Sequence, residues 1–408
     1  MGAPAGLAVR AAAAAALVSA GLAGCAAATT GQVPGPLSST RRAGGSASGA
    51  SQGPPVTVYV IAGGAVVAIR AAAGTPGRVI AAGTVPDAIA VTPDGKTAYA
   101  VDAYNSNLIP INTATLAAGR RITVGERLMG IGITPDGRTA YVLSYETGTV
   151  IPVSTATGKP GADISVGGAG TFPTAIAVTP DGKTAYVPAT TSAGKEVVTP
   201  IDTATGTAGK PISAGTSHAG GCDADVIAIT PGGQTAYVTD YTNGTVIPIS
   251  TATGTAGPPI RTGTNPSAIA ITPDGKTAYV TSQGSGTVTP IQVATNTPGP
   301  PIKIGKPINP IASGCATYAI AITPDGKTAY VTSYNDGTVI PISTATGTAG
   351  PPIRTGTNPS DIAITPDGET AYVSNKGSGT VTPIDTATNT PGTPIRAGSG
   401  PGPIAIAR

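Results

Sequence analysis

Short apolar runs and polar turns alternate along most of the chain, in an order that repeats from one unit to the next. In a representative unit, residues 268–272 are apolar on both faces of a strand, as expected of a strand covered on both sides. Pro-Asp-Gly at 273–275 predicts a tight turn, because proline fixes φ and glycine accepts a positive φ. Two further runs lie at 277–282 and 287–291, and a short proline-flanked run lies at 301–304. The unit is therefore predicted to hold four antiparallel strands, the last one at an exposed edge.

The motif Thr-Pro-Asp-Gly-x-Thr-Ala-Tyr marks seven copies of this unit with little variation. Its tyrosines are 42, 45, 51, 42, 51 and 42 residues apart, at Tyr99, Tyr141, Tyr186, Tyr237, Tyr279, Tyr330 and Tyr372. A unit of this size with four strands is typical of one blade of a β-propeller, whose blades bury their faces against each other. We expect the tyrosines to pack between blades, with each hydroxyl bonded at a blade edge.

The two ends of the repeat region complement each other. Residues 56–61 read as a second strand without its first strand, and residues 403–407 read as a first strand after which the chain stops. Pairing these two strands would close a ring. We therefore predict an all-β fold for residues 56–408, a propeller of eight four-stranded blades closed by the terminal strands, with seven blades as the alternative if one end unit is degenerate.

The N-terminal region predicts a cellular location rather than a folded domain. Residues 1–24 have one positive charge and a short apolar stretch, as in a signal peptide, and Leu-Ala-Gly-Cys ends at Cys25, the pattern of a bacterial lipobox. We expect Cys25 to be lipidated; the alternative is ordinary cleavage nearby, with Cys25 discarded. Residues 25–55 are rich in Ala, Ser, Thr, Gly and Pro and read as a flexible tether. The expected location is extracytoplasmic, with contact to the membrane through the lipid alone.

The amino-acid composition argues against nucleic acid as a partner. The chain has a net charge of +3, no Trp and a single Phe, whereas nucleic-acid binders cluster Lys and Arg with aromatic platforms. We expect no nucleic-acid binding, and a monomer.

The second strands resemble the YVTN-family β-propeller repeat. The matching tetrapeptides are Tyr-Val-Thr-Asp at 237–240, Tyr-Val-Thr-Ser at 279–282 and 330–333, and Tyr-Val-Ser-Asn at 372–375. The resemblance implies the propeller fold, and it implies little about activity, since this family of surface-layer and secreted bacterial proteins mostly lacks assigned activities.

Length variation is confined to one face of the predicted ring. The first-to-second and third-to-fourth turns share one face, the turn face, while the second-to-third turns and the segments that cross between blades share the other, the crossing face. All insertions fall on the crossing face, near 167–172, 190–196, 213–225 and 303–318. Loops on rigid scaffolds carry binding function, so we expect a partner-binding rim there, with neutral drift as the alternative. Its candidate residues are Lys195, Glu196, His218, Asp223, Asp225, Lys306 and Tyr318.

Two of these insertions hold the remaining cysteines, Cys222 and Cys315. Both precede first strands on the same face, and an extracytoplasmic site favours a disulfide between them. The alternative is that a duplicated two-blade block simply copied one cysteine into the other place.

Catalytic chemistry has few candidates. His218 is the only histidine, and its spacing to Cys222, Asp223 and Asp225 matches no established zinc pattern. The repeated aspartates lie in the Pro-Asp-Gly turns, and one unit carries Gly232 in that place. We therefore expect no catalytic residue, metal or cofactor. A non-enzymatic module that binds an envelope protein or glycan is favoured, and the alternative is a lactonase-like hydrolase or lyase at the channel mouth.

Overall fold

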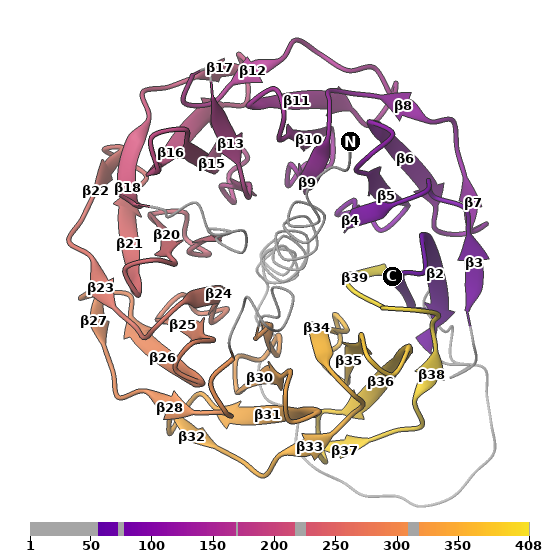
Figure 1. The fold of residues 1–408 in the computed structure, drawn as a ribbon, viewed down its shortest axis with the longest axis vertical. Helices are drawn as coiled ribbons and strands as arrows, with labels where there is room; N and C mark the ends of the chain where they lie inside the picture. The colour runs from indigo at the N-terminus through magenta and orange to yellow at the C-terminus, as the bar shows by residue number, and fades with distance from the viewer. Residues whose placement is uncertain (1–55, 72–76, 169, 217–225, 309–317, 408) are drawn as a thin grey trace, which may run out of the picture.

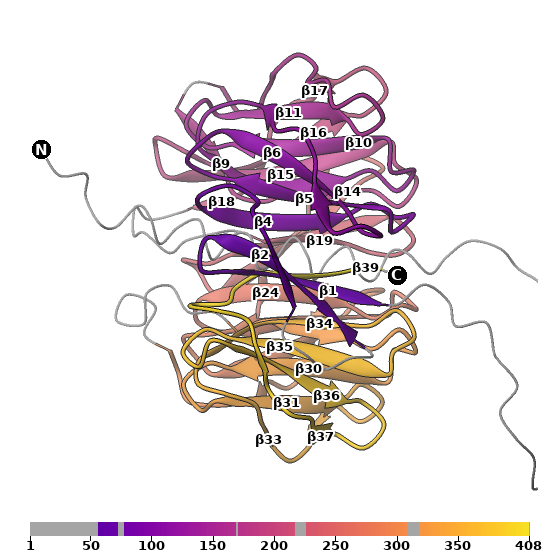
Figure 2. The same ribbon diagram turned by 90° about the vertical axis from the view of Figure 1, so that its right-hand side faces the viewer.

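The fold is a closed ring of eight antiparallel sheets, seen down its axis in Figure 1 and from its side in Figure 2. This computed structural model describes residues 56–71, 77–168, 170–216, 226–308 and 318–407. The all-β fold and the eight blades are confirmed. The predictions for residues 1–55, Cys25 included, lie outside the described residues.

One blade illustrates how the sequence pattern becomes structure. In blade 6, β24 (Pro266–Ile271) lies nearest the ring axis and pairs with β25 (Thr277–Ser282), which pairs with β26 (Thr287–Gln292). The fourth strand differs from the expectation, because it is split into β27 (Thr297–Pro298) and β28 (Ile302–Lys303), both paired with β26. Gly-Pro-Pro lies between them, and neither proline has an N–H to donate to the ladder. The same split occurs in blade 2 at Gly119-Arg120-Arg121, without a proline, and in both blades the glycine N–H bonds to a proline carbonyl of the third strand.

The other blades follow the same plan. Blade 1 contains β1 (Thr57–Ala62), β2 (Ala65–Arg70), β3 (Arg78–Ile80) and β39 (Ile404–Ala407), and blade 2 contains β4 (Pro86–Val91), β5 (Thr97–Asp102), β6 (Asn107–Asn112), β7 (Ala117–Ala118) and β8 (Ile122–Thr123). Blade 3 contains β9 (Leu128–Ile133), β10 (Thr139–Ser144), β11 (Thr149–Ser154) and β12 (Ile164–Ser165), and blade 4 contains β13 (Thr171–Pro173), β14 (Ala177–Val178), β15 (Thr184–Thr191), β16 (Lys195–Asp202), β17 (Thr207–Ala208) and β18 (Ile212–Thr216). Blade 5 contains β19 (Ile227–Ile229), β20 (Thr235–Asp240), β21 (Thr245–Ser250), β22 (Thr255–Ala256) and β23 (Ile260–Arg261). Blade 7 contains β29 (Ile320–Ile322), β30 (Thr328–Ser333), β31 (Thr338–Ser343), β32 (Thr348–Ala349) and β33 (Ile353–Arg354), and blade 8 contains β34 (Pro359–Ile364), β35 (Thr370–Asn375), β36 (Thr380–Asp385), β37 (Thr390–Pro391) and β38 (Ile395–Arg396).

The hydrophobic core is divided among the interfaces between blades. Tyr279 and Val288 of blade 6 pack with Ile320 and Val331 of blade 7 in one cluster, and corresponding clusters fill the other interfaces. Each blade therefore depends on its neighbours for burial, as expected of a repeat architecture. No helix among the described residues is long and apolar enough to cross a membrane.

The seam between blades 8 and 1 is closed by the end of the chain. β39 pairs antiparallel with β1, with Val60 opposite Ile404, which confirms the predicted closure. Two side chains of β34 also reach across the seam. Ser360 Oγ donates to Pro401 O at 3.0 Å, and Asp361 Oδ2 accepts the Ile404 N–H at 2.9 Å.

Candidate functional site

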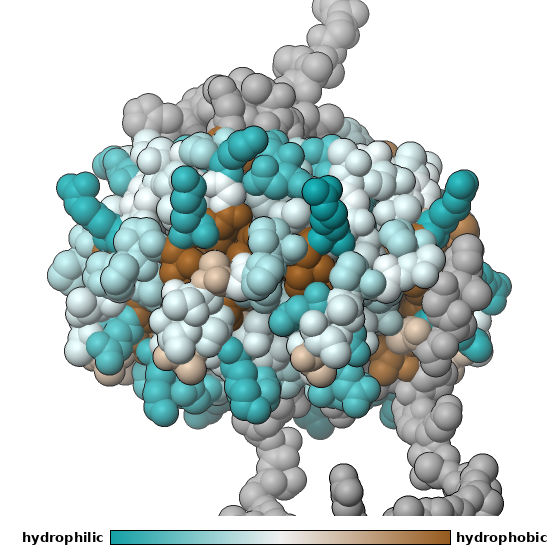
Figure 3. Space-filling view, turned by 90° about the horizontal axis from the view of Figure 1, so that it is seen from below, coloured by the Kyte–Doolittle hydropathy of each residue, from teal (hydrophilic) through white to brown (hydrophobic). Residues whose placement is uncertain are grey.

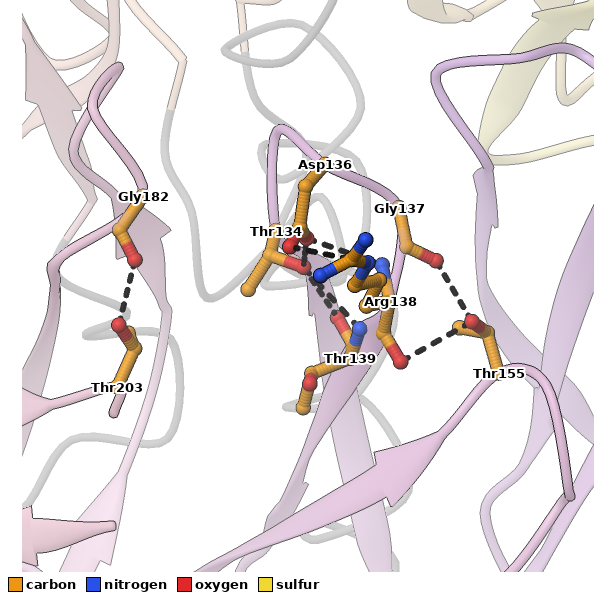
Figure 4. Close-up of polar contacts among 8 residues, drawn as sticks. All are labelled: Thr134, Asp136, Gly137, Arg138, Thr139, Thr155, Gly182 and Thr203. Carbon is orange, nitrogen blue, oxygen red and sulfur yellow. Dashed lines mark hydrogen bonds and ion pairs between the residues drawn. The ribbon is translucent and has the colours of Figure 1, made fainter. Parts of the chain in front are cut away.

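The turn face is built from one hydrogen-bond network that recurs around the ring. In blade 3, Thr134 Oγ1 donates to Asp136 Oδ1 at 2.6 Å (Figure 4). Asp136 Oδ1 also accepts the Arg138 N–H at 3.0 Å. Thr155 Oγ1, from the third-to-fourth turn, donates to Gly137 O at 2.6 Å. The hydrogen bond from Thr134, followed by that from the Arg138 N–H, lowers the pKa of the Asp136 carboxyl.

Five other aspartates make the same bond to the threonine two residues before them. They are Asp94, Asp181, Asp274, Asp325 and Asp367. Their carboxyl groups serve the turn, where a side-chain oxygen replaces a backbone acceptor. The turn face is therefore a repeated structural surface whose turn aspartates already have partners.

Five of the seven repeated tyrosines donate a hydroxyl hydrogen bond to the next blade, as expected: Tyr99, Tyr186, Tyr237, Tyr279 and Tyr330. Tyr99 OH of blade 2 donates to Thr155 O of blade 3 at 3.3 Å, and Tyr330 OH of blade 7 donates to Asn389 Oδ1 of blade 8 at 2.6 Å. Burial raises the pKa of Tyr330 to about 12. The phenols are thus neutral structural groups at ordinary pH.

On the crossing face, the segments between blades are fixed by side chains at the ends of the second strands. Asp102, at the end of β5, is fully buried, and its two carboxyl oxygens accept the N–H groups of Thr84 and Val85 at 3.1 and 3.2 Å. A Cβ at Gly83 would lie 2.3 Å from Asp102 Oδ2, so this approach of the crossing segment requires glycine. In blade 3, Ser144 takes the same place and accepts the Glu126 N–H at 2.9 Å. The loops of the crossing face therefore adjoin crossing segments that are hydrogen-bonded to the blades.

Two residues of the predicted rim lie in blade 4, on the longest hairpin of the ring. β15 and β16 have eight residues each, against six for the corresponding strands of blade 6, so their tip extends further from the crossing face. Lys195 is exposed on this hairpin, whereas Glu196 is only 2% exposed. Thr190 Oγ1 donates to Glu196 Oε1 at 2.7 Å, and Glu196 Oε2 has no partner among the described residues.

Two more predicted residues meet at the crossing from blade 6 to blade 7. Lys306 is exposed, and its backbone carbonyl accepts the hydroxyl of Tyr318, whose side chain is fully buried. Burial raises the pKa of Tyr318 to about 12. Tyr318 therefore holds the crossing in place from inside, and this pair belongs to a different part of the rim from the blade 4 hairpin. The other residues of the prediction lie outside the described residues: His218, Cys222, Asp223, Asp225 and Cys315.

The structure also reveals a rim cluster that sequence reasoning missed, between blades 3 and 4. The rings of Tyr145 and Phe172 stack with centroids 4.9 Å apart, and Met129 packs against them. The Arg127 guanidinium lies 5.7 Å from the Tyr145 ring centroid and 3.5 Å from a Glu146 oxygen. Arg127 also has a φ of 50°, which is uncommon for a residue other than glycine.

A signal for this cluster exists within the chain. Blades 6 and 8 are preceded by the crossing Thr-Asn-Pro-Ser, at 264–267 and 357–360, whereas blade 3 has Glu-Arg-Leu-Met at 126–129. The left-handed position occupied by Arg127 holds Asn265 and Asn358 in those crossings. Blade 3 thus departs from the repeat sequence at a position with a strained, left-handed backbone, and this departure is the sequence signal for the cluster.

One acid of the crossing end is unlike the turn aspartates. Asp87 lies in the bulge of β4, where the pairing with β5 skips one residue, and it is 8% exposed. Burial raises the pKa of its carboxyl to about 7, and Asp87 Oδ2 has no partner among the described residues.

Buried polar atoms without partners gather at the crossing end of the blades. In the described part of the chain there are eight such side-chain atoms. Seven belong to residues at strand ends or loops of the crossing face: Asp87, Thr171, Glu196, Thr245, Ser282, Gln283 and Asn375. The eighth belongs to Thr199, within β16, and none belongs to the turn face. Over the same residues, no three His, Cys, Asp or Glu side chains are grouped to hold a metal ion.

Comparison with known proteins supports the fold. No protein-family model and no curated protein matches the sequence. A structure titled Kuenenia stuttgartiensis hydrazine synthase aligns over 74% of this chain and 96% of its own, with 22% identity and a TM-score of 0.57. Dihydro-heme d1 dehydrogenase NirN in complex with DHE aligns over 85% and 74%, with 14% identity and a TM-score of 0.67. A functionally unknown protein from Desulfotomaculum acetoxidans aligns over 77% and 99%, with 19% identity and a TM-score of 0.56. At such identities the likeness concerns the propeller fold alone.

Proposed function

We propose that this protein is a non-enzymatic binding module, held outside the cytoplasm by a lipid on Cys25, and that its crossing face binds an envelope protein or glycan. The observation that carries the proposal is the unequal distribution of buried polar atoms without partners. Seven of the eight lie at the crossing end and none at the turn face, among the described residues. Such groups cost about 1–3 kcal/mol each when they stay unpaired. Because the protein covers each of these atoms, an ordered water or a rearrangement of the loops on binding is needed to pair them, and the crossing face is the one that gains from it.

The architecture of the two faces supports the same assignment. The turn face repeats one network and pairs its acids internally, so it offers the same surface on most blades. The crossing face combines fixed crossings with loops of unequal length, including the β15–β16 hairpin with exposed Lys195. Varied loops on a rigid scaffold are the usual arrangement of a binding surface.

The anchor and the class of partner rest on the sequence. The lipobox at Cys25 and the tether of residues 25–55 favour a propeller carried near the membrane, and the resemblance to the YVTN-family repeat agrees with a bacterial surface protein. A tether of this composition is flexible, so it leaves the crossing face free to meet other envelope components.

The test uses two charge-matched variants of the full chain carrying Cys25→Ser, each immobilised and exposed to a solubilised envelope extract. Lys195→Glu with Lys306→Glu changes the crossing face, and Lys96→Glu with Lys276→Glu changes the turn face; all four lysines are exposed. We expect the crossing-face variant to lose captured material that the parent and the turn-face variant retain. Equal capture by the crossing-face variant, with loss in the turn-face variant, would contradict the proposal.

A further inference from the structure

The outer wall of the ring carries a row of four cations on consecutive blades. Each is the exposed last residue of a short outer strand, β23, β28, β33 or β38: Arg261, Lys303, Arg354 and Arg396. All four share one register, because each lies opposite the threonine that begins the third strand of its blade. They therefore lie at one height around the wall. Figure 3 shows hydrophilic projections in such a row along this side of the ring.

This outer cationic row has no internal counter-charge. The ion pairs of the described residues include none of its four members, whereas turn-face lysines are paired, for example Lys276 Nζ with Asp274 Oδ2 at 3.4 Å. The four outer segments contain no Asp or Glu: residues 255–262, 297–304, 348–355 and 390–397. The row is therefore a line of positive charge available to a partner.

The row covers only part of the circumference. At the same register, blades 2, 3 and 4 carry exposed neutral residues: Thr123, Ser165 and Ser213. The outer strands of neighbouring blades are in contact from blade 5 to blade 8, so the cationic part is continuous. The outer segments of blades 2, 3 and 4 hold exposed cations at other positions: Arg120, Arg121, Lys159 and Lys210. What distinguishes blades 5 to 8 is that a cation occupies this one register on four adjacent blades.

The curvature of the row decides which partner fits it. Eight blades share a full turn, about 45° each, so the outward direction rotates by about 135° over the three steps from Arg261 to Arg396. A flat membrane meets only the cations of two neighbouring blades at once, while a flexible chain can follow the whole arc. Three of the four cations are arginines, whose planar donor fork matches phosphate oxygens in pairs.

We propose that the outer cationic row binds a flexible linear phosphate polymer without bases, which bends around blades 5 to 8. Each cation contacts one phosphate, and the contacts add through multivalency, since they lie on one rigid ring. This surface lies on the outer wall, and of its four members Lys303 borders a loop of the proposed binding face. The two tests change different residues, so either assignment can fail without the other.

The test measures binding of long-chain inorganic polyphosphate to the full chain carrying Cys25→Ser, over a range of salt concentrations. The row variant combines Arg261→Gln, Lys303→Gln, Arg354→Gln and Arg396→Gln. Its matched control removes four turn-face charges by Lys96→Gln, Lys183→Gln, Lys276→Gln and Lys327→Gln. By analogy with single-stranded nucleic acids, at about 0.7 per phosphate contact, four contacts predict a log–log salt slope near 3. We expect the row variant to lose that slope and at least tenfold in affinity, and the control to change less than twofold.

A gain-of-function variant tests the wrapping itself. Thr123→Arg, Ser165→Arg and Ser213→Arg extend the row onto blades 2, 3 and 4, respectively, at exposed positions. We expect a steeper salt slope and tighter binding of polyphosphate. The proposal is overturned if the parent does not bind polyphosphate, if the row and control variants lose affinity equally, or if polygalacturonate binds equally well. It is also overturned if the row variant loses binding to phosphatidylglycerol vesicles but not to polyphosphate.

Discussion

Replacing Asp361 with alanine is expected to weaken the closure of the ring at the seam between blades 8 and 1. Asp361 is fully buried, and its two oxygens accept the N–H groups of Ile362 at 2.8 Å and Ile404 at 2.9 Å. The second bond joins residues 43 positions apart and ties β34 to the strand that completes blade 1. Ala88 and Ala268 occupy the same register in β4 and β24, so an alanine fits the backbone at this place.

The magnitude follows from the bonds lost. A hydrogen bond contributes about 0.5–1.5 kcal/mol net, and a buried donor left without a partner costs about 1–3 kcal/mol. Removal of a buried carboxyl returns part of its desolvation cost. We therefore expect Asp361→Ala to make local opening of the seam about 2 kcal/mol easier, which is roughly a 30-fold change in the opening equilibrium. Asp361→Asn keeps one acceptor oxygen for two donors, so it should have about half this effect.

Hydrogen exchange measured by mass spectrometry reports the effect where it occurs. Peptides covering residues 401–407 should exchange faster in Asp361→Ala, less so in Asp361→Asn, while peptides from β16 should keep their protection. Ser267→Ala is the control, since it removes a hydroxyl of blade 6 that lies far from the seam. Unchanged exchange at 401–407, or an equal increase in β16, would refute the account of the seam.

Four further predictions follow from the same structure and sequence. Because burial raises the pKa of Asp87 from 3.8 to about 7, the folded state holds this proton more tightly than the unfolded chain does. The contribution of Asp87 to the free energy of unfolding should therefore be complete below about pH 4 and decline until about pH 7. Urea unfolding at several pH values should show this decline in the parent and a flatter profile in Asp87→Asn. An unaltered pH profile in Asp87→Asn would contradict the assignment. Cys25→Ser should move the protein from the membrane fraction to the medium, and continued membrane retention would exclude the lipid anchor. Non-reduced peptide mapping should recover Cys222 linked to Cys315, whereas two alkylated thiols would rule out the disulfide. Deletion of residues 401–408 should lower the melting temperature sharply, because β1 loses its partner strand; melting like that of the intact chain would argue against a structural role for the tail.

The fold was accessible from the sequence because its determinants are local. Strand β25 was predicted with the bounds it has, since alternating side chains and the Pro-Asp-Gly turn act within a few residues. The eight blades followed from counting the copies, and the pairing of β1 with β39 followed from the unmatched strands at the two ends. The split of the fourth strand was missed, and prolines alone do not mark it, because blade 2 has the same split around Gly119-Arg120-Arg121.

The candidate site was less accessible, because burial on the crossing face depends on contacts between distant segments. Lys195 and Glu196 are adjacent in the chain, yet one is exposed and the other buried. Tyr318 was expected on the rim and lies inside it, under the backbone of Lys306. Side-chain direction at an irregular crossing has no periodic pattern from which it can be inferred.

Repetition made the strand order, the turns and the number of blades readable from the chain, since each depends on residues close together in sequence. Which residues of different blades lie close together could be seen only in the folded protein. The bond between Asp361 and Ile404 and the cluster around Arg127 depend on how neighbouring blades pack against each other. The common height of Arg261, Lys303, Arg354 and Arg396 follows from the register that each blade repeats, and their arc follows from the rotation of successive blades about one axis. Packing between blades brings together residues that no local pattern relates, because they come from different repeats.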